Sequence, residues 1–272
     1  MKIIACFYCE DHLLESFGGI KLMNSWKYFH PDIPIIWYGN KKADFIRKKY
    51  EKFDFLSFEC VIMYETKLQY NADIIIFIDC DSIVLDRLDE VLKGDYEVAS
   101  VRNDPIQHTE NEDHNRPIKG VPNEKWVNAG FIAINGDKFL LDWIAINADA
   151  LYNKSNGIHY YKMVENDTLN ILFHSGKYKT KILDAVDTNL YYGPASQYNT
   201  LNRKPPKSIE RYGYYFCESW LDIKLVNNKP MLNNKYIKVL HQCHGGGPPK
   251  LQYELFSDEF LPYVKKITQC DF

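Results

Sequence analysis

The most restrictive feature of the chain is an apolar run that ends abruptly in two acids. Residues 74–78 are Ile-Ile-Ile-Phe-Ile, and Asp79-Cys80-Asp81 follow at once. The run is too short to cross a membrane, and its β-branched residues favour a strand that is buried on both faces. Open α/β sheets bind ligands beyond the carboxyl ends of their strands. The two acids are therefore expected where such a fold holds a ligand.

Asp79 and Asp81 carry the first chemical prediction. Two carboxylates this close repel each other unless a proton or a cation lies between them. The economical interpretation is a divalent metal on hard oxygen ligands that holds a phosphate-bearing substrate. A solvated strand end is the structural alternative, but few such ends follow a continuous apolar strand.

Composition limits the class of protein. The chain has 272 residues, of which 46% are hydrophobic and 25% charged, so it is long enough to bury a large core. We expect a single domain over residues 1–272. The formal net charge of -3 argues against non-specific nucleic-acid binding. Local basic clusters such as Lys41-Lys42 are explained by solvated helix faces.

The cysteines and the N-terminal residues indicate where in the cell the protein is expected. Seven cysteines, an odd number scattered along the chain, favour a reduced intracellular protein over a disulfide framework. The N-terminal segment resembles a first strand rather than a signal peptide. No run approaches the roughly 18 apolar residues of a transmembrane helix. We expect a cytoplasmic protein; peripheral association with a membrane and assembly into a homo-oligomer are left open.

Strand-like and helix-like segments alternate in the first hundred residues, which predicts an α/β fold with a mostly parallel sheet and helices on both faces. Strands are expected at residues 2–8, 33–38, 74–78, 97–101, 127–135, 182–186 and 236–241. Helices are expected at residues 13–29, 43–53, 88–92, 139–152, 162–172 and 257–266. Residues 104–122 are polar, contain prolines and are expected to form a surface loop.

Five segments in order resemble glycosyltransferase family 8. They are Thr66-Lys67-Leu68 before the apolar strand, Asp79-Cys80-Asp81 with the residues up to 92, Asn128-Ala129-Gly130, Glu165-Asn166-Asp167-Thr168-Leu169-Asn170, and Val239-Leu240-His241 with Gly245-Gly246-Gly247 and Lys250. Each motif alone is short. Their shared order over most of the chain makes the resemblance specific.

The resemblance implies a GT-A fold, which is a Rossmann-like mixed α/β sheet flanked by helices. It also implies transfer of a hexose from a UDP-sugar, with Mn²⁺ or Mg²⁺ and with retention of configuration. Residues 1–104 would form the nucleotide-sugar-binding half. Residues 105–272 would form the acceptor side and a C-terminal closing segment. The acceptor would be a saccharide, a glycolipid or a protein.

By the same resemblance, Asp79, Asp81 and His241 bind the metal. An imidazole beside two carboxylates suits Mn²⁺ better than Ca²⁺. His244 competes with His241 for the ligand role. We favour His241 because it directly follows an apolar strand, and a purely structural role for either histidine is the alternative.

The residues that the resemblance assigns to the donor lie in five parts of the chain. An aromatic ring at the end of the first strand would stack on the base, and Asn128 would bind sugar hydroxyls. Backbone N–H groups of a glycine loop can approach phosphate oxygens closely, and a lysine can add positive charge there. The plain alternatives are core packing, a flexible turn and surface lysines. The full set is Phe7, Tyr8, Lys67, Asp79, Asn128, Gly245, Gly246 and Lys250.

Glu165, Asn166 and Asp167 are assigned to the reacting carbon. Here the chain departs from the family pattern, because Glu165 replaces an aspartate and Asn166 replaces a glutamine. The carboxylate is thereby displaced by about one methylene, which leaves the sugar and the stereochemical outcome open. The structural alternative is a helix start, where acids favour the N-terminal dipole.

Three other functions are compatible with parts of the sequence. A haloacid-dehalogenase-like phosphatase also has an apolar strand followed by DxDx(T/V), with the first Asp as nucleophile. However, Ile83 stands at the Thr/Val position, and that strand normally opens the domain. An inverting GT-A transferase would use the same metal–diphosphate site. A non-catalytic nucleotide-sugar or glycan-binding module is the third alternative.

Overall fold

The computed structural model describes residues 1–15, 18–50, 58–102, 125–156, 164–183, 190–192, 223–232, 235–241 and 257–270. The chain divides into two compact units. The first comprises Met1–Glu10, Ile35–Ile78 and Val91–Ile182; the second comprises Asp11–Pro34, Asp79–Glu90 and Leu183–Phe272. Both units use segments from before and after residue 104. The single domain and its two halves therefore remain predictions.

A six-stranded sheet in the order β2-β1-β3-β6-β5-β7 forms the first unit. Its parallel part is β2, β1 and β3, and β6 runs antiparallel to both of its neighbours, β3 and β5. The mixed α/β sheet expected from the sequence is confirmed. The bounds are β1 Ile3–Tyr8, β2 Ile35–Tyr38, β3 Ile74–Ile78, β5 Val98–Arg102, β6 Val127–Asn135 and β7 Thr180–Leu183.

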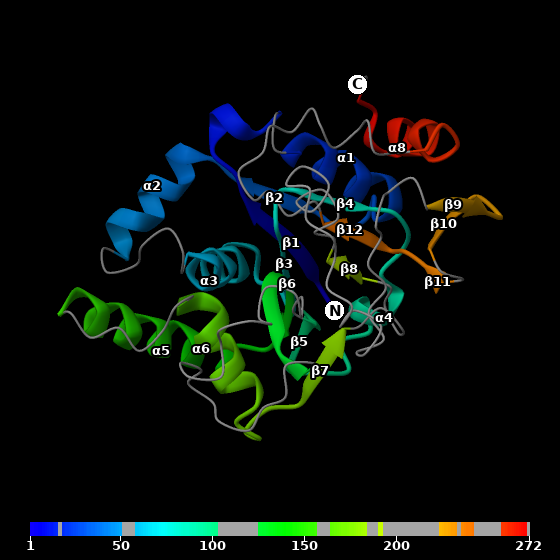
Figure 1. Ribbon diagram of the computed structural model, residues 1–272. Helices are drawn as coiled ribbons and strands as arrows, with labels where there is room; N and C mark the ends of the chain where they lie inside the picture. The colour runs from blue at the N-terminus through cyan, green and yellow to red at the C-terminus, as the bar shows by residue number, and fades with distance from the viewer. Residues whose placement is uncertain are drawn as a thin grey trace. The chain divides into compact units, whose positions relative to one another are not determined.

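Helices α3 (Glu59–Tyr70), α5 (Lys138–Ser155) and α6 (Val164–Phe173) lie together in the first unit, and α2 (Asn40–Lys49) follows β2 (Figure 1). Trp143 of α5 is completely buried, and its Nε1 donates to Thr168 Oγ1 at 3.1 Å. That bond lets a large aromatic ring fill the core without leaving its N–H unsatisfied.

One helix prediction needs correction, and one helix was not predicted. The helix expected at residues 13–29 is a short 3₁₀ turn, Asp11–Leu13, followed by α1, Gly19–Phe29. Gly18 has φ +100°, a left-handed conformation that helical residues do not adopt, so α1 begins after it. Helix α3 was not predicted, because its apolar residues are nearly consecutive. Such a helix is buried on most sides and lacks the one-sided pattern of a surface helix.

The second unit contains Asp79, Asp81 and His241, the residues predicted to bind a metal. Its sheet has the order β4-β12-β8, in which β12 (Val239–His241) runs antiparallel to β4 (Ser82–Val84) and parallel to β8 (Leu190–Tyr192). A second sheet contains β9 (Lys224–Val226), β10 (Lys229–Leu232) and β11 (Lys235–Tyr236). Figure 1 shows α8 (Phe260–Thr268) beside α1, and the short α4 spans Asp89–Leu92.

The core of this unit joins β4, β12 and α8. Its buried members are Ile83, Leu85, Ile223, Ile237, Leu240, Phe260, Val264 and Ile267. Asn227 and Asn228 connect β9 to β10, and both have positive φ, at 54° and 60°. Two consecutive left-handed residues match the two-residue hairpin turn whose twist fits antiparallel strands.

His30 is a buried titratable group in the second unit. Its ring is completely buried and packs on Trp26, with 4.8 Å between ring centroids. Within the described residues, neither ring nitrogen has a hydrogen-bond partner. Burial, and then the charge of Arg87, lower the pKa of His30 to about 4, although three nearby aspartates act in the opposite direction.

We expect His30 to make the fold acid-sensitive. Its folded pKa lies below the unfolded value of about 6.5, so the unfolded chain binds the proton first. The stability contributed by neutral His30 is full above pH 6.5 and is lost as the pH falls towards 4, by up to about 3 kcal/mol. Melting temperatures between pH 7 and 4.5 should therefore fall less in His30→Phe than in the wild type. Equal pH dependence in the two proteins would contradict the assignment.

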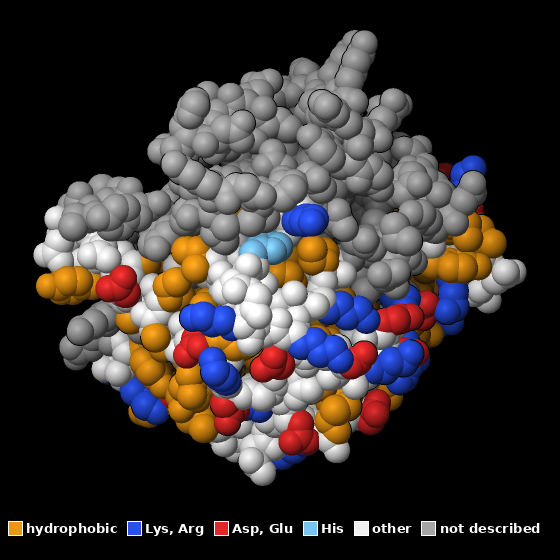
Figure 2. Space-filling view, turned by 90° about the horizontal axis from the view of Figure 1, so that it is seen from below, with side chains coloured by type: hydrophobic (Ala, Val, Ile, Leu, Met, Phe, Trp, Pro, Cys, Tyr) orange, Lys and Arg blue, Asp and Glu red, His pale blue; other side chains and the backbone are white. Residues whose placement is uncertain are grey.

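Charge is mixed on the surface. On the face in Figure 2, Lys and Arg side chains are interspersed with Asp and Glu rather than gathered in one basic patch. This matches the small net charge of the chain. Across the described ranges, no helix has both the length and the apolar character needed to span a membrane.

Candidate metal centre

The DxD segment directly follows β3, whose five residues are all buried. The chain then turns, with the N–H of Ser82 donating to the carbonyl of Asp79 at 3.1 Å, and continues as β4. The Asp79 side chain remains 35% exposed and that of Asp81 14% exposed. The turn therefore presents two partly buried carboxylates next to the first residue of β4.

Strand β12 brings His241 to these acids. The β12–β4 ladder pairs Val239 with Val84, Leu240 with Ile83 and His241 with Ser82. His241 Nε2 lies 2.8 Å from Asp81 Oδ1 and 3.4 Å from Asp79 Oδ2. One ligand atom from each of the three residues lies within 4.8 Å of the other two. Side chains from distant parts of the sequence thus converge on one point.

The three ligand atoms suit a small divalent cation. An octahedral ion with bonds of about 2.1 Å has neighbouring ligand atoms about 3 Å apart. The separations of 2.8 and 3.4 Å lie on either side of that value. Two carboxylate oxygens with one imidazole nitrogen match Mn²⁺, which accepts both ligand types. Asp79, Asp81 and His241 could hold such an ion with little rearrangement.

The pKa of Asp79 also favours a cation at this position. Burial raises the pKa of Asp79; the nearby His241 opposes this shift, and the charge of Asp81 adds to it. Ionisation of Asp79 is therefore less favourable in the protein alone than it is in water. A cation between the acids would remove that cost, because it favours the charged form of both.

The rest of the predicted closing segment lies outside the described residues. This applies to Gly245, Gly246 and Lys250, and also to His244, the competing metal ligand. Their assignments remain predictions. The side chain of His241 is 7% exposed. As predicted from the sequence, His241 lies at the end of an apolar strand.

Lys67 has local partners that account for its burial. Its ammonium donates to the carbonyls of Ala72 and Asp73, the latter at 3.0 Å, and lies 3.3 Å from Asp137 Oδ1. Lys67 is in the last turn of α3, where cations stabilise the exposed carbonyl end of a helix. This structural role is the alternative to a donor contact, which stays a prediction for Lys67.

Phe7 and Tyr8 differ in accessibility. Phe7 is completely buried, which agrees with plain core packing. Tyr8 is partly buried; its ring meets Phe58 edge-on, with 6.0 Å between centroids, and its hydroxyl accepts a hydrogen bond from Arg47 at 3.3 Å. Stacking on a base needs an accessible ring, so only Tyr8 is kept for that role.

The segment at the start of β6 is held by amide side chains of α6. Asn170 Oδ1 accepts from the N–H of Val127 at 2.9 Å, and its Nδ2 donates to the carbonyl of Val127 at 2.8 Å. One helical turn earlier, Asn166 Oδ1 accepts from the N–H of Ala129 at 2.9 Å. Residues four apart on the helix therefore bind residues two apart on the strand. Asn128 is fixed between the two contacts.

Glu165 lies beside this clamp and is 7% exposed; its Oε1 accepts from Asn166 Nδ2 at 3.1 Å. Asn128 Oδ1 accepts from the N–H of Gly130 at 2.6 Å. The structure thus brings Glu165, Asn166 and Asn128 together within the first unit. Asn166 is engaged in positioning β6, and its catalytic role remains a prediction. The clamp role of Asn170 was missed, although its position one helical turn after Asn166 was visible in the sequence.

Asn170→Ala should destabilise the protein by about 2–3 kcal/mol, because a buried N–H and a buried carbonyl of Val127 lose their partner. Urea unfolding would measure the loss. Asn153→Ala, which removes an exposed amide from α5, should change stability by less than about 0.5 kcal/mol. Equal losses in the two variants would show that the clamp has no special role.

The comparisons with known proteins bear on the fold. No protein-family model and no curated protein matches the chain. The galactosyltransferase LgtC, solved with donor and acceptor sugar analogues, superposes with a TM-score of 0.53 at 14% identity, over 98% of this chain and 94% of that one. An active-site variant of LgtC gives 0.52 at 15% identity, over the same shares.

The apo form of the glycosyltransferase GlyE of Streptococcus pneumoniae TIGR4 gives a TM-score of 0.55 at 14% identity. The match covers all of this chain and 61% of GlyE. At these identities the likeness shows the fold. The GT-A fold, and the resemblance to glycosyltransferases that have it, are confirmed at that level.

Proposed function

We propose that the protein is a metal-dependent glycosyltransferase that moves a hexose from a UDP-sugar to an acceptor hydroxyl with retention of configuration. One observation carries the proposal. In a chain with the fold of glycosyltransferases, Asp79, Asp81 and His241 place three ligand atoms within 4.8 Å of one another. Such a group suits a divalent cation, and a diphosphate is a natural further ligand for that cation.

In the proposed mechanism, Asp79 and Asp81 would supply two carboxylate oxygens and His241 would supply Nε2 to Mn²⁺ or Mg²⁺. When bound, the cation neutralises the charge that grows on the diphosphate as the sugar–phosphate bond breaks. Gly245, Gly246 and Lys250 are proposed to bind the same leaving group through backbone N–H groups and an ammonium. The sugar carbon would gain oxocarbenium character as its bond to the diphosphate breaks. The acceptor hydroxyl would attack that carbon on the face from which UDP leaves, and its proton would pass to an oxygen of the leaving diphosphate.

The first unit is proposed to serve the sugar and the base. Asn128 has an amide that can donate to one hydroxyl and accept from another. Glu165 and Asp167 would stabilise positive charge at the reacting carbon, and Tyr8 would contact the base. The acceptor class is a saccharide, a glycolipid or a protein, and we expect the reaction to take place in the cytoplasm.

The phosphatase alternative accounts for less of the structure. A nucleophilic Asp79 with Asp81 as its partner would give no role to His241, which lies 2.8 Å from Asp81 Oδ1. The two solved proteins compared above are also glycosyltransferases. An inverting transferase would use the same metal ligands, so the stereochemistry is decided only by the product.

The test is UDP release from a panel of UDP-hexoses, with Mn²⁺, with EDTA, and with Mn²⁺ restored in excess over EDTA. The proposal expects release with at least one sugar, loss of release in EDTA and its recovery with Mn²⁺. NMR of the product's anomeric proton then distinguishes retention from inversion. Hydrolysis of p-nitrophenyl phosphate, without UDP release from any donor, would instead support the phosphatase.

A further inference from the structure

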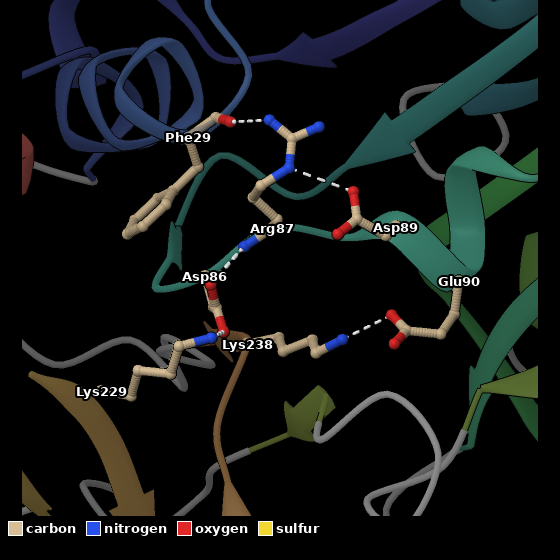
Figure 3. Close-up of polar contacts among 7 residues, drawn as sticks. All are labelled: Phe29, Asp86, Arg87, Asp89, Glu90, Lys229 and Lys238. Atoms are coloured by element: carbon tan, nitrogen blue, oxygen red, sulfur yellow. Dashed lines mark hydrogen bonds and ion pairs between the residues drawn. The ribbon is translucent and has the colours of Figure 1, made fainter. Parts of the chain in front are cut away.

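Charged side chains tie the segment after the DxD turn to the strands that lead to His241 (Figure 3). Lys238 forms an ion pair with Glu90, and Lys229 Nζ lies 2.7 Å from Asp86 Oδ2. Arg87 adds a third link within the same unit, since its guanidinium donates to the carbonyl of Phe29 at 3.1 Å. These pairs join parts of the chain that are far apart in sequence.

Lys238 is fixed through both its backbone and its side chain. Its carbonyl accepts from the N–H of Leu85 at 2.7 Å, which extends the β4–β12 ladder by one step. Its side chain is only 14% exposed. Partial burial tends to raise the pKa of Glu90, but the hydrogen bond and charge of Lys238, together with a backbone hydrogen bond, lower it overall. Glu90 is therefore held as a carboxylate at neutral pH.

The ion pair gives the strand that carries His241 a contact outside its two ladders. Strand β12 has three residues, so its ladder with β4 is short. A slip of one residue in a strand turns every side chain to the opposite face. For β12 that slip would remove His241 from Asp79 and Asp81. The mutual repulsion of those two acids also disfavours the compact arrangement before a cation binds.

From these contacts we infer that Glu90 and Lys238 are positioning residues that fix the register of β12 on β4 and so hold His241 Nε2 at the metal position. The inference rests on the proposed function, because the bound metal is what the arrangement serves. Lys229 provides a comparison within the same unit. It pairs with the same segment, but it lies on β10, which carries no ligand, and its side chain is 50% exposed.

The test is direct Mn²⁺ binding, measured without donor by the electron paramagnetic resonance signal of the free ion. Lys238→Met and Glu90→Gln should each bind Mn²⁺ about tenfold more weakly than the wild type, as is typical when a group that orients a metal ligand is lost. The exchanged pair, Lys238→Glu with Glu90→Lys, should recover most of the affinity. Lys229→Met should stay within about twofold of the wild type.

Melting temperatures of the same samples separate positioning from general stability. A lower melting temperature with unchanged Mn²⁺ affinity in Lys238→Met and Glu90→Gln would overturn the inference and leave the proposed function intact. An equal loss of affinity in Lys229→Met would overturn it too. If the single variants do not fold, the exchanged pair decides: wild-type affinity supports the inference, and tenfold weaker binding overturns it. A wild type that binds no Mn²⁺ would overturn both proposals.

Discussion

Asp81→Asn is expected to reduce metal-dependent transfer from a UDP-sugar by about 10³-fold, which is on the scale of losing a preorganised electrostatic contact to the transition state. Asp81 Oδ1 lies 2.8 Å from His241 Nε2, so the substitution removes a charged ligand from the centre of the group. An amide of the same shape keeps the packing but holds a divalent cation poorly. Initial rates of UDP release at saturating Mn²⁺ measure the effect.

The matched control is Asp149→Asn, which neutralises an exposed acid on α5. It should leave the rate unchanged. Circular dichroism should show both variants folded. Full activity in a folded Asp81→Asn protein would reject the metal-ligand assignment, and equal losses in the two variants would attribute the effect to overall charge.

Glu165→Gln is expected to lower kcat by about 10²-fold or more while UDP and Mn²⁺ still bind, because the carboxylate is proposed to stabilise positive charge on the sugar only as the bond breaks. Glu165 is 7% exposed and accepts from Asn166 Nδ2. Its amide replacement preserves size and most contacts. Steady-state kinetics, with calorimetric titration of UDP, separate the chemical step from binding.

Glu165→Asp is the companion variant, because it keeps the charge and restores the shorter acid of the family pattern. It should retain more activity than Glu165→Gln. If Glu165→Gln and Glu165→Asp lose activity equally, together with UDP binding, then Glu165 supports the fold near β6 and has no direct part in the reaction.

The apolar strand and its acids were predictable because burial on both faces requires a continuous apolar run, and polar residues can appear only where it ends. The structure confirms that strand as β3 and groups Asp79 with Asp81. The role of His241 could not be predicted in this way. An apolar strand that ends in histidine is common, and only the resemblance connected it with the acids.

What could not be predicted depends on contacts between distant residues. The amide of Asn170 binds Val127, and that of Asn166 binds Ala129. No local sequence pattern predicts these two contacts. The resemblance assigned Lys67 to the donor, and that role stays a prediction. The sequence did not show that its ammonium binds the carbonyls of Ala72 and Asp73, which follow its own helix. The Glu90–Lys238 pair could not be predicted either, because the sequence does not show which charged residues lie next to each other in the fold.

The most direct test of the central claim is calorimetric titration of UDP into the wild-type protein and into Asp81→Asn, each with and without Mn²⁺. We expect the wild type to bind UDP only with Mn²⁺, and Asp81→Asn to lose this binding. Binding of UDP that is equally strong without Mn²⁺, or unchanged in Asp81→Asn, would contradict a metal centre on Asp79, Asp81 and His241.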